Sequence, residues 1–458
     1  MSQNQDAAAS LYRKDPKVYP RDVKGSFASL RKLAVFVLLG LYYILPWLNW
    51  GGHQSVLFDL PARKFYIFGL TFWPQDFIFL TLMLIIAGLS LFFVTAVAGR
   101  LWCGYACPQT VWTEVFLWME RWVEGDRGKR IKLDASPWNA NKILRKTSKQ
   151  ILWIGFALWT GFTFVGFFTP IRGLGASVVT FQLGGWETFW MLFYSFATYG
   201  NAGILREQVC KYMCPYARFQ SAMFDKDTLV IAYDEARGEP RGARAKKDSP
   251  VEKGLGDCIG CTLCVQVCPT GIDIREGLQI ECIACAACID VCDQVMDKMD
   301  YKRGLISYTT EHRLSGKETR VFRPRIAVYA VLLLALVAGV IYSVNNRVLL
   351  RADMLHDRNA LYRELPGDQI ENVYTLKLIN MDFKPHQYKI EVLNNDDIRV
   401  LISPEPELDP EEVGNFIMRM QAPRSAGKGS MKVDVRFSTM DEPVIERTIS
   451  ARFLMPFD

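Results

Sequence analysis

The sequence predicts a multi-domain protein: an α-helical membrane part with about five transmembrane helices, an inserted α+β domain, and a C-terminal all-β sandwich. Three observations predict this class. Apolar runs long enough to cross a bilayer recur along the chain, eight cysteines lie between Cys258 and Cys292, and short alternating strands follow residue 345. At 458 residues the chain is long enough for two or three domains.

Composition narrows the possible partners and the compartment. The formal net charge is +6, and the lysines and arginines lie beside apolar runs rather than among base-stacking aromatic residues. We therefore expect a membrane partner and no nucleic acid. All 12 cysteines fall between Cys103 and Cys292, which is expected if they face a reducing cytoplasm and bind metal instead of forming disulfides.

The first residues, 1–32, are polar and basic and show no periodic apolar face. They predict a flexible cytoplasmic arm. The membrane domain, residues 33–204, follows with four spans, and residues 325–344 hold a fifth; each span approaches the roughly 20 residues that cross a bilayer. The predicted spans are residues 33–50, 77–98, 151–168, 186–204 and 326–343.

The loops between these runs predict the orientation of the chain. A cytoplasmic amphipathic segment, residues 110–123, places Trp112, Trp118 and Trp122 where they suit the membrane interface. The arm and the loop 99–150 are rich in lysine and arginine and should lie inside, whereas the loops near 51–75 and 170–185 should lie outside. Five spans then leave residues 205–324 in the cytoplasm and residues 345–458 in the periplasm.

The last part of the chain, residues 345–458, reads as short strands with alternating apolar residues. Breaks such as Asn394-Asn395-Asp396-Asp397 separate them. This regular spacing predicts a β-sandwich of the immunoglobulin-like class.

The cysteine spacing in residues 205–324 predicts a bacterial-type ferredoxin domain. C-x2-C-x2-C-x3-C occurs twice, and in this pattern the fourth thiolate ligates the other cluster. Structural zinc is the alternative, which the doubled spacing disfavours. The two predicted [4Fe-4S] ligand sets are Cys258, Cys261, Cys264 and Cys292 for one, and Cys282, Cys285, Cys288 and Cys268 for the other.

A second repeat, C-x3-C-P, occurs once after each even-numbered span. Residues i and i+4 share one face of an α-helix, so each pair could present two thiolates, and the two pairs could meet at the membrane boundary. Soft thiolates favour copper(I), zinc or iron–sulfur centres; the alternative is inert cysteines packed between helices. The candidate catalytic residues, which would hold copper or a further iron–sulfur centre, are Cys103, Cys107, Cys210 and Cys214.

Other cofactors find little support. The chain has 4 histidines, none inside a predicted span, which excludes a b-type haem held by paired membrane histidines. A c-type haem motif, a phosphate-binding loop and a dinucleotide fingerprint are missing, so electrons must come from a cytoplasmic donor that the sequence does not identify. Copper binding outside the membrane is a weak alternative, for which the residues are His53, His356, His386, Met381, Met418, Met420, Met431 and Met440.

The cysteine-rich run resembles the ferredoxin segment of the CcoG/FixG/RdxA family, the accessory proteins of cbb3-type cytochrome c oxidase. In a generic ferredoxin a proline follows the second repeat; here Asp293 follows Cys292, as in this family. The resemblance covers nearly the whole chain. It implies a multi-pass protein of the bacterial inner membrane and an immunoglobulin-like C-terminal domain.

The resemblance also implies an activity: reduction of Cu(II) to Cu(I) in the cytoplasm, with copper as the substrate ion, for insertion into a cbb3-type oxidase. Its expected partners are a copper chaperone or transporter and oxidase assembly components, and the oligomeric state, a homo-oligomer included, stays open. Two alternatives remain. One is a quinol-linked electron-transfer module, and the other is a non-catalytic assembly scaffold whose clusters are structural.

Overall fold

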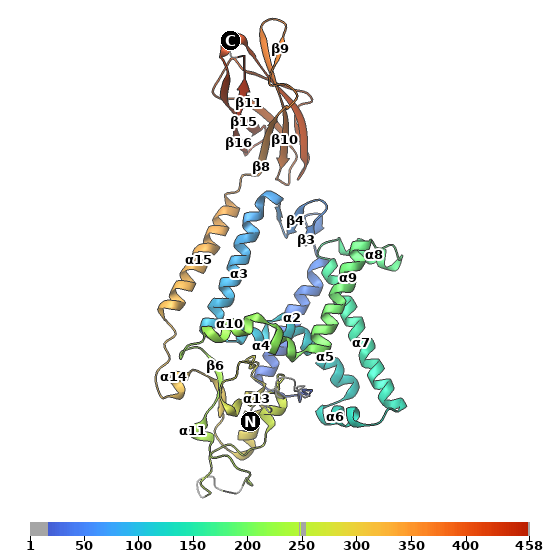
Figure 1. Ribbon diagram of the computed structural model, residues 1–458, viewed down its shortest axis with the longest axis vertical. Coiled ribbons are helices and arrows are strands. Elements are labelled where there is room, and N and C mark those ends of the chain that lie inside the picture. The colour runs from blue at the N-terminus through green and yellow to red at the C-terminus, as the bar shows by residue number, and fades with distance from the viewer. Residues whose placement is uncertain (1–16, 247, 249–252, 457–458) are drawn as a thin grey trace, which may run out of the picture. The chain divides into compact units, whose positions relative to one another are not determined.

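The computed structural model describes residues 17–246, 248 and 253–456. It divides into two compact units, Met1–Val337 and Ala338–Asp458, each of which is described by itself. Figure 1 labels the elements.

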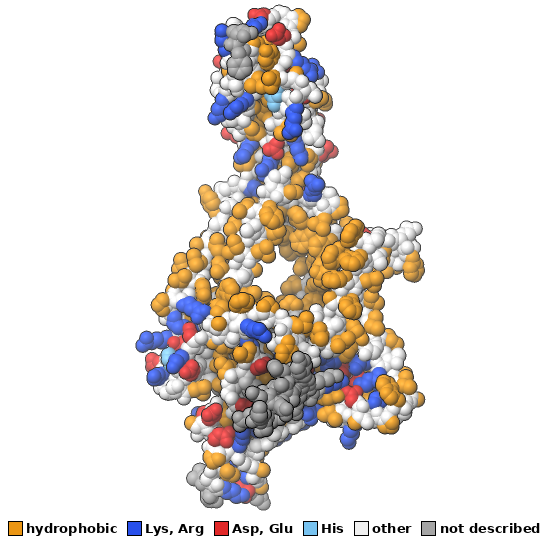
Figure 2. Space-filling model, viewed as in Figure 1, with side chains coloured by type: hydrophobic (Ala, Val, Ile, Leu, Met, Phe, Trp, Pro, Cys, Tyr) orange, Lys and Arg blue, Asp and Glu red, His pale blue; other side chains and the backbone are white. Residues whose placement is uncertain are grey.

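Three helical segments of the described chain are long and apolar enough to cross a membrane: Ser26–Trp47, Pro74–Ala98 and Pro324–Asn345. They correspond to the first, second and fifth predicted spans, and contain α2 (Ser26–Ile44), α3 (Phe77–Ala98) and α15 (Pro324–Asn345). Hydrophobic side chains cover the outer faces of α3 and α9 (Gly185–Thr198) (Figure 2). Such exposed apolar faces suit lipid and would be unfavourable in water.

The third and fourth predicted spans fall in α7 (Ala140–Val165) and α9. The first turns of α7 are basic, and α9 continues into a π-helical segment, η3 (Tyr199–Leu205). The two helices pack closely, because a Cβ at Gly161 would collide with the Ser195 side chain. Whether both cross the bilayer stays a prediction.

Short elements connect these helices. A three-stranded antiparallel sheet in the order β3-β4-β5 follows α2, and α4 to α6 lie between α3 and α7. Their bounds are β3 Val56–Asp59, β4 Lys64–Ile67, β5 Leu70–Phe72, α4 Leu101–Tyr105, α5 Pro108–Glu124, α6 Arg127–Ala135 and α8 Ile171–Val179. After α9 and η3 come a second π-helical segment, η4 (Val209–Met213), and α10 (Pro215–Met223).

The cysteine-rich domain is a small α+β fold. Strand β6 (Val230–Tyr233) pairs antiparallel with β7 (Ile306–Thr309), and between them in the chain lie α12 (Leu263–Val267) and α13 (Ala287–Met299). Ile231, Met296, Leu305 and Ile306 form a core between the strands and α13. The shorter helices of this region are α11 (Glu235–Gly238) and α14 (Glu311–Leu314).

The expectation of a flexible N-terminal arm is wrong for the described residues 17–25. The Arg21 backbone N–H donates to Gln266 O at 2.8 Å, and the Tyr19 hydroxyl donates to Asp134 at 2.6 Å. The arm is therefore fixed between the cysteine-rich domain and α6. Its backbone groups gain partners there that a sequence pattern cannot reveal, and α2 begins at Ser26, within the predicted arm. Arg13 and Lys14 lie outside the described residues.

The second unit is a sandwich of two antiparallel sheets, as the strand pattern predicted. One sheet has the order β12-β14-β10-β8, with β9 paired to β10, and the other has the order β13-β11-β15-β16. The bounds are β8 Leu350–His356, β9 Arg363–Leu365, β10 Gln369–Asn380, β11 His386–Val392, β12 Arg399–Ile402, β13 Glu407–Leu408, β14 Val413–Pro423, β15 Ser430–Thr439 and β16 Glu446–Leu454.

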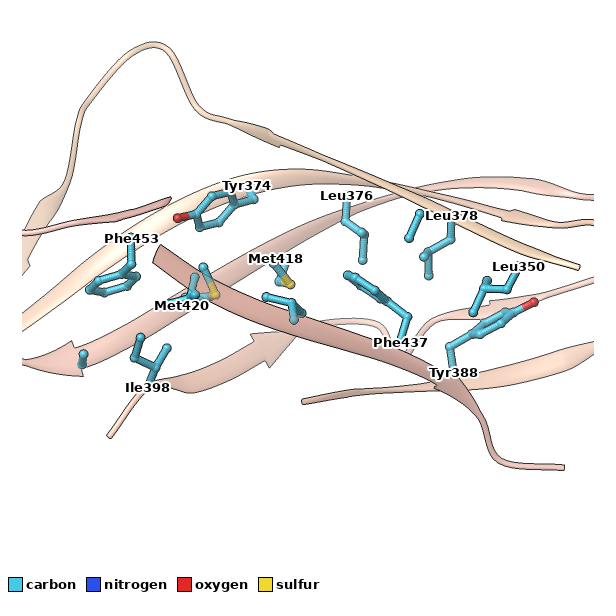
Figure 3. Packing of buried hydrophobic residues seen from close by; sticks show 14 of the residues in the cluster. Leu350, Tyr374, Leu376, Leu378, Tyr388, Ile398, Met418, Met420, Phe437 and Phe453 are labelled. Atoms are coloured by element: carbon cyan, nitrogen blue, oxygen red, sulfur yellow. The ribbon is translucent and has the colours of Figure 1, made fainter. Parts of the chain in front are cut away.

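Alternate residues of both sheets point into one core (Figure 3). Met418 and Met420 are fully buried in it beside Phe437 and Phe453, so these methionines fill the core. The His386 ring is held between Asp382 (3.0 Å) and Asp441 (3.3 Å). The burial of Met418 and Met420 in this core leaves copper binding at these two methionines without support.

Candidate functional site

The eight ferredoxin-type cysteines line two neighbouring cavities. One is lined by Cys258, Cys261, Cys264 and Cys292, which we call the first set. The other is lined by Cys268, Cys282, Cys285 and Cys288, the second set, and also by Cys264. Each cavity thus carries the four thiols of one predicted ligand set, as crossed ligation by the fourth cysteine of each repeat requires.

The backbone around both cavities is wound alike. Gly260 and Thr262 in the first repeat have φ of 68° and 56°, and Ala284 and Ala286, at the same positions of the second, have φ of 54° and 59°. The left-handed backbone conformation is costly for residues other than glycine, and such residues cluster at functional sites. Such windings aim successive N–H groups at an anion, as many iron–sulfur sites require. The residues therefore fit a thiolate-bound iron–sulfur cube.

The donor side chains do not converge on a single point. Among the described residues, no three His, Cys, Asp or Glu side chains come together as they would around one metal ion. The thiols of each set instead stand around a cavity, which suits a cluster in which each thiolate binds a different iron.

The structure corrects the expected geometry of the C-x3-C-P repeats. Cys103 lies in α4, but Cys107 is extended and is the residue before α5, which begins at Pro108. Likewise Cys210 lies in the π-helical η4, and Cys214 is the residue before α10. The two cysteines of a pair therefore do not share one α-helix face. Proline forces the residue before it into an extended conformation and fits the first position of a helix, so each motif forms a corner.

The four boundary cysteines, Cys103, Cys107, Cys210 and Cys214, nevertheless lie near one another. Burial, and then the nearby thiols of Cys107, Cys103 and Cys214, raise the pKa of Cys210 to about 12. The Cys103 thiol donates to Gln220 of α10 at 3.4 Å, which joins the first motif to the helix that follows the second. Metal binding would release these protons, because the thiolate is the ligand form.

This boundary site lies against the second set. Cys103 and Cys210 pack on a buried cluster that includes Ile283 and Cys285. A Cβ at Gly104 would lie 2.8 Å from the carbonyl oxygens of both Ile283 and Ala284, so only glycine permits this approach. The backbone between Cys282 and Cys285 therefore touches the first C-x3-C-P motif.

Two arginines from membrane segments also reach the second set. Arg31, on α2, donates to Cys285 O at 3.4 Å, and Arg100, just after α3, donates to Cys282 O at 3.3 Å. Arg100 is only 5% exposed. Burial lowers the pKa of Arg100, and the thiols of Cys103 and Cys282 act in the opposite direction.

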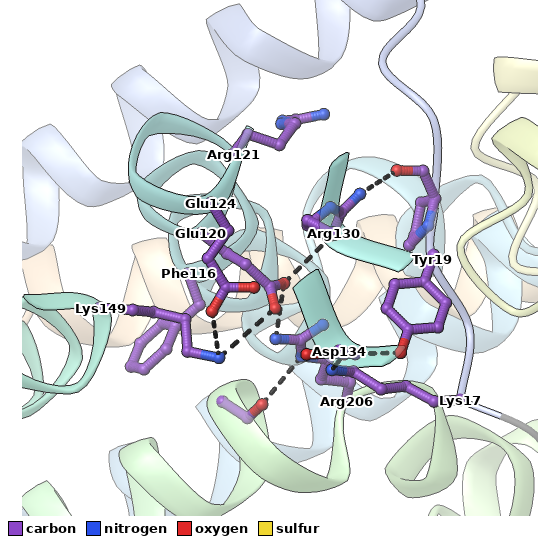
Figure 4. A network of polar contacts seen from close by, with 12 residues as sticks. Lys17, Tyr19, Phe116, Glu120, Arg121, Glu124, Arg130, Asp134, Lys149 and Arg206 are labelled. Carbon is purple, nitrogen blue, oxygen red and sulfur yellow. Dashed lines mark hydrogen bonds and ion pairs between the residues drawn. The ribbon is translucent and has the colours of Figure 1, made fainter. Parts of the chain in front are cut away.

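A buried ion network holds the elements around the boundary cysteines (Figure 4). Glu120 of α5 is fully buried and pairs with Arg206 at 2.8 Å, Arg130 at 3.2 Å and Lys149 at 3.6 Å. Burial would raise the pKa of Glu120, but the charges of Arg206, Lys149 and Arg130 outweigh it and hold that pKa below its usual range. Arg206 precedes η4, so the network ties α5, α6 and α7 to the segment that carries Cys210.

The cysteine-rich domain also caps the first membrane helix. Asp290 lies on α13 between Cys288 and Cys292 and accepts the Phe27 N–H at 3.3 Å and the Ala28 N–H at 2.7 Å. A Cβ at Gly25 would collide with this carboxylate. One side chain thus links the helix that carries two predicted cluster ligands to the start of α2.

Replacing Asp290 with alanine should free the start of α2, because a capping carboxylate contributes about 1 kcal/mol. That energy corresponds to an increase of about fivefold in local opening. We therefore expect trypsin to cleave at Arg21 and Lys24 faster by about that factor in detergent-solubilised protein. Asp290→Asn keeps one acceptor oxygen, so its cleavage rate should lie between those of the wild type and Asp290→Ala. Equal cleavage rates in all three proteins would show that the cap does not hold the arm.

Sequence patterns did not reveal Arg31, Gly104, Gln220 or Asp290 as parts of the site. Two weak signals existed: Gly104 lies inside a C-x3-C-P motif, and Asp290 lies between two ligand cysteines. Neither residue is chemically unusual, and their roles arise from contacts with residues more than a hundred positions away in the chain.

Comparison with known proteins agrees with these features. Three family models match: a 4Fe-4S dicluster domain at residues 205–311, a 4Fe-4S binding domain at residues 79–130, and an immunoglobulin-like fold at the C-terminus of FixG at residues 340–456. The second covers Cys103 and Cys107. The expectation of iron–sulfur binding and of an immunoglobulin-like C-terminal domain is therefore confirmed, while the number of clusters stays a prediction.

The chain is 40% identical over 410 residues to the nitrogen fixation protein FixG of Rhizobium meliloti, covering 81% of this chain and 78% of FixG. It is 40% identical over 436 residues to RdxB of Cereibacter sphaeroides, covering 92% of this chain and 91% of RdxB. A crystal structure of a FixG-related protein from Vibrio parahaemolyticus matches 23% of this chain and 96% of its own, with 23% identity and a TM-score of 0.21. From the first two relatives, the chain belongs to the FixG/RdxA/RdxB family and is a membrane iron–sulfur protein of that family.

Proposed function

We propose that this protein transfers electrons through two [4Fe-4S] clusters and reduces Cu(II) to Cu(I) at the boundary cysteines, for assembly of a cbb3-type oxidase. One observation carries the proposal: Cys103 and Cys210 pack on the buried cluster that includes Cys285, and Gly104 touches the loop between Cys282 and Cys285. A soft-metal site beside an iron–sulfur site suits a one-electron reduction of copper.

The residues have separate roles in this proposal. The first and second sets hold the clusters, which supply single electrons when bound. The boundary thiolates bind the copper ion. Cu(II) gains one electron and becomes Cu(I), and this electron transfer itself moves no proton. Thiolates prefer Cu(I) to Cu(II), so their differential affinity favours the product. Gly104 permits the contact between the two sites.

A cleft offers the copper ion a route to the boundary site. It is lined by both Cys210 and Cys285, and its charged walls carry arginines as well as Glu114 and Glu207. The thiol of Cys210 suits the reduced copper ion. We infer that the ion approaches through this cleft.

The topology belongs to the same proposal. With α7 and α9 as the third and fourth spans, the chain crosses the bacterial inner membrane five times. The arm and the cysteine-rich domain then lie in the cytoplasm with an unidentified electron donor and a copper chaperone or transporter, and residues 345–458 meet oxidase assembly components in the periplasm.

The test is an anaerobic reoxidation experiment on the purified full-length protein. Dithionite reduces it, Cu(II) is added, and the iron–sulfur absorbance is followed while a Cu(I)-specific chelator reports the product. We expect one Cu(I) per electron lost. In the double variant Cys103→Ser with Cys214→Ser, we expect this reaction to be lost. The iron and sulfide of the two ferredoxin-type clusters should stay, so any loss should not exceed the content of one cluster at the boundary site. Equal rates in both proteins would overturn the assignment of the boundary cysteines.

One observation favours quinol oxidation as a second candidate. An apolar cavity of about 680 Å³ is lined by Phe164 of α7 and by Trp190 and Tyr194 of α9, with Glu187 also on its wall. Such a cavity could take a quinol, whose oxidation releases two electrons and two protons. If a short-chain quinone reoxidises the reduced protein while Cu(II) does not, the quinol function replaces the copper function.

A further inference from the structure

We propose that Arg31 and Arg100 raise the reduction potential of the iron–sulfur cluster that the second cysteine set holds. The inference rests on the two-cluster assignment of the proposed function but does not depend on copper. It assigns the task of making a buried cluster reducible to two residues outside the cysteine-rich domain, one on α2 and one just after α3.

Both guanidinium groups reach the backbone of the cluster ligands themselves. Arg31 donates to the carbonyl of Cys285 and Arg100 to that of Cys282. The two arginines come from different membrane segments, α2 and the end of α3. The second set thus receives a positive charge from each of two elements that the cysteine-rich domain does not contain.

These charges are only partly compensated. The described hydrogen bonds of Arg100 go to the carbonyl oxygens of Cys282 and Ala217, and its Nε atom is buried without a hydrogen-bond partner. Arg31 Nε lies 3.9 Å from Glu114, a carboxylate that also pairs with Arg121 at 3.1 Å. Both arginines therefore keep positive charge directed at the second set.

The first set has a different environment. Arg275 lines its cavity, but Asp273 holds that guanidinium with two contacts of 2.8 and 2.5 Å. Cys261 is also exposed, whereas Cys285 is buried. Solvent therefore reaches the first set at Cys261, whereas none of the four cysteines of the second set is exposed, so added charge is less well hydrated there.

Reduction adds one negative charge to the cluster, without a proton or a change of bonds in the protein. In a buried site this added charge loses hydration, which disfavours the reduced form. Nearby fixed positive charges offset that cost, and net charge and hydrogen bonding set the potentials of iron–sulfur centres. The two arginines supply this compensation where the solvent is excluded.

The test is a redox titration of the full-length protein in detergent, with the reduced clusters followed by electron paramagnetic resonance. Arg100→Gln keeps an amide donor but removes the charge. In this variant we expect the midpoint potential of one reduction wave, that of the second-set cluster, to become more negative. At a fixed potential the ratio of reduced to oxidised cluster should fall about tenfold, which is about 59 mV for a one-electron couple. Arg100→Lys should restore most of the shift.

Arg275→Gln is the matched control at the first set. This change leaves Asp273 unpaired there. We therefore expect the reduction wave of the first-set cluster to become more negative, while the wave that Arg100→Gln shifts stays in place. Iron and sulfide contents of each variant show that both clusters are present. If Arg100→Gln does not assemble its clusters, Arg31→Gln serves as the second variant, with the same expected direction.

Two outcomes would overturn the inference. One is that Arg100→Gln and Arg31→Gln, with full cluster content, leave both waves in place. The other is that they shift both waves equally, as a general loosening of the domain would. Wild-type protein that shows only one cluster would instead refute the two-cluster assignment, and this inference with it, while leaving Cu(II) reduction to be judged by its own assay.

Discussion

Replacing Glu120 with alanine should destabilise the first unit by about 3–5 kcal/mol, the usual cost of removing one partner from a buried ion pair. The substitution removes the carboxylate that pairs with Arg206 and Arg130, both of which are buried, while Lys149 keeps its ion pair with Glu124 at 2.9 Å. The two desolvated guanidinium groups then face each other without that counter-ion and repel each other. We expect a clearly lower midpoint of thermal unfolding, measured by tryptophan fluorescence in detergent.

Asp134→Ala is the matched control. Asp134 belongs to the same region and pairs with Lys146 at 2.5 Å and Lys17 at 2.8 Å, but its side chain is 24% exposed. Partly exposed pairs contribute about 1 kcal/mol or less, so this change should cost much less. Glu120→Gln, which keeps hydrogen bonding but loses the charge, should lie between the two. If Glu120→Ala lowers the midpoint no more than Asp134→Ala does, the network does not stabilise the fold.

The sequence predicted what depends on local patterns. The doubled C-x2-C-x2-C-x3-C spacing predicted an iron–sulfur domain, which the family model at residues 205–311 confirms, because ligand spacing is a property of a short segment. Apolar runs located three segments that the structure shows as long apolar helices, and alternation located the strands of the sandwich. These signals need no knowledge of distant contacts.

The remaining features depend on residues far apart in the chain. The arm 17–25 looked unstructured because its partners, such as Gln266 and Asp134, lie more than a hundred residues away. The C-x3-C-P motifs looked helical because their spacing fits one helix turn, but the proline after each second cysteine starts a new helix there. Spacing alone cannot show where one helix ends and the next begins.

Introducing valine at Gly104 should separate the boundary site from the second cysteine set. The new Cβ would lie 2.8 Å from the carbonyl oxygens of Ile283 and Ala284, and backbone atoms cannot rotate away as side chains can. Overpacking of this kind costs about 1–3 kcal/mol. A wider gap weakens the electronic contact between the two sites, so electron transfer across it slows. We expect Cu(II)-dependent reoxidation of the reduced protein to slow severalfold.

Gly128→Val is the control for Gly104→Val, because nothing lies within 4 Å of a Cβ at Gly128 on α6. It should leave the reoxidation rate unchanged. The variant Gly104→Ala introduces the same Cβ with less bulk and should give an intermediate rate. Because Gly104 is not a ligand, all three proteins should keep the iron content of the second set. A slow rate with full iron content therefore identifies the distance between the two sites as the cause, whereas a normal rate in Gly104→Val would show that electrons do not leave through this contact.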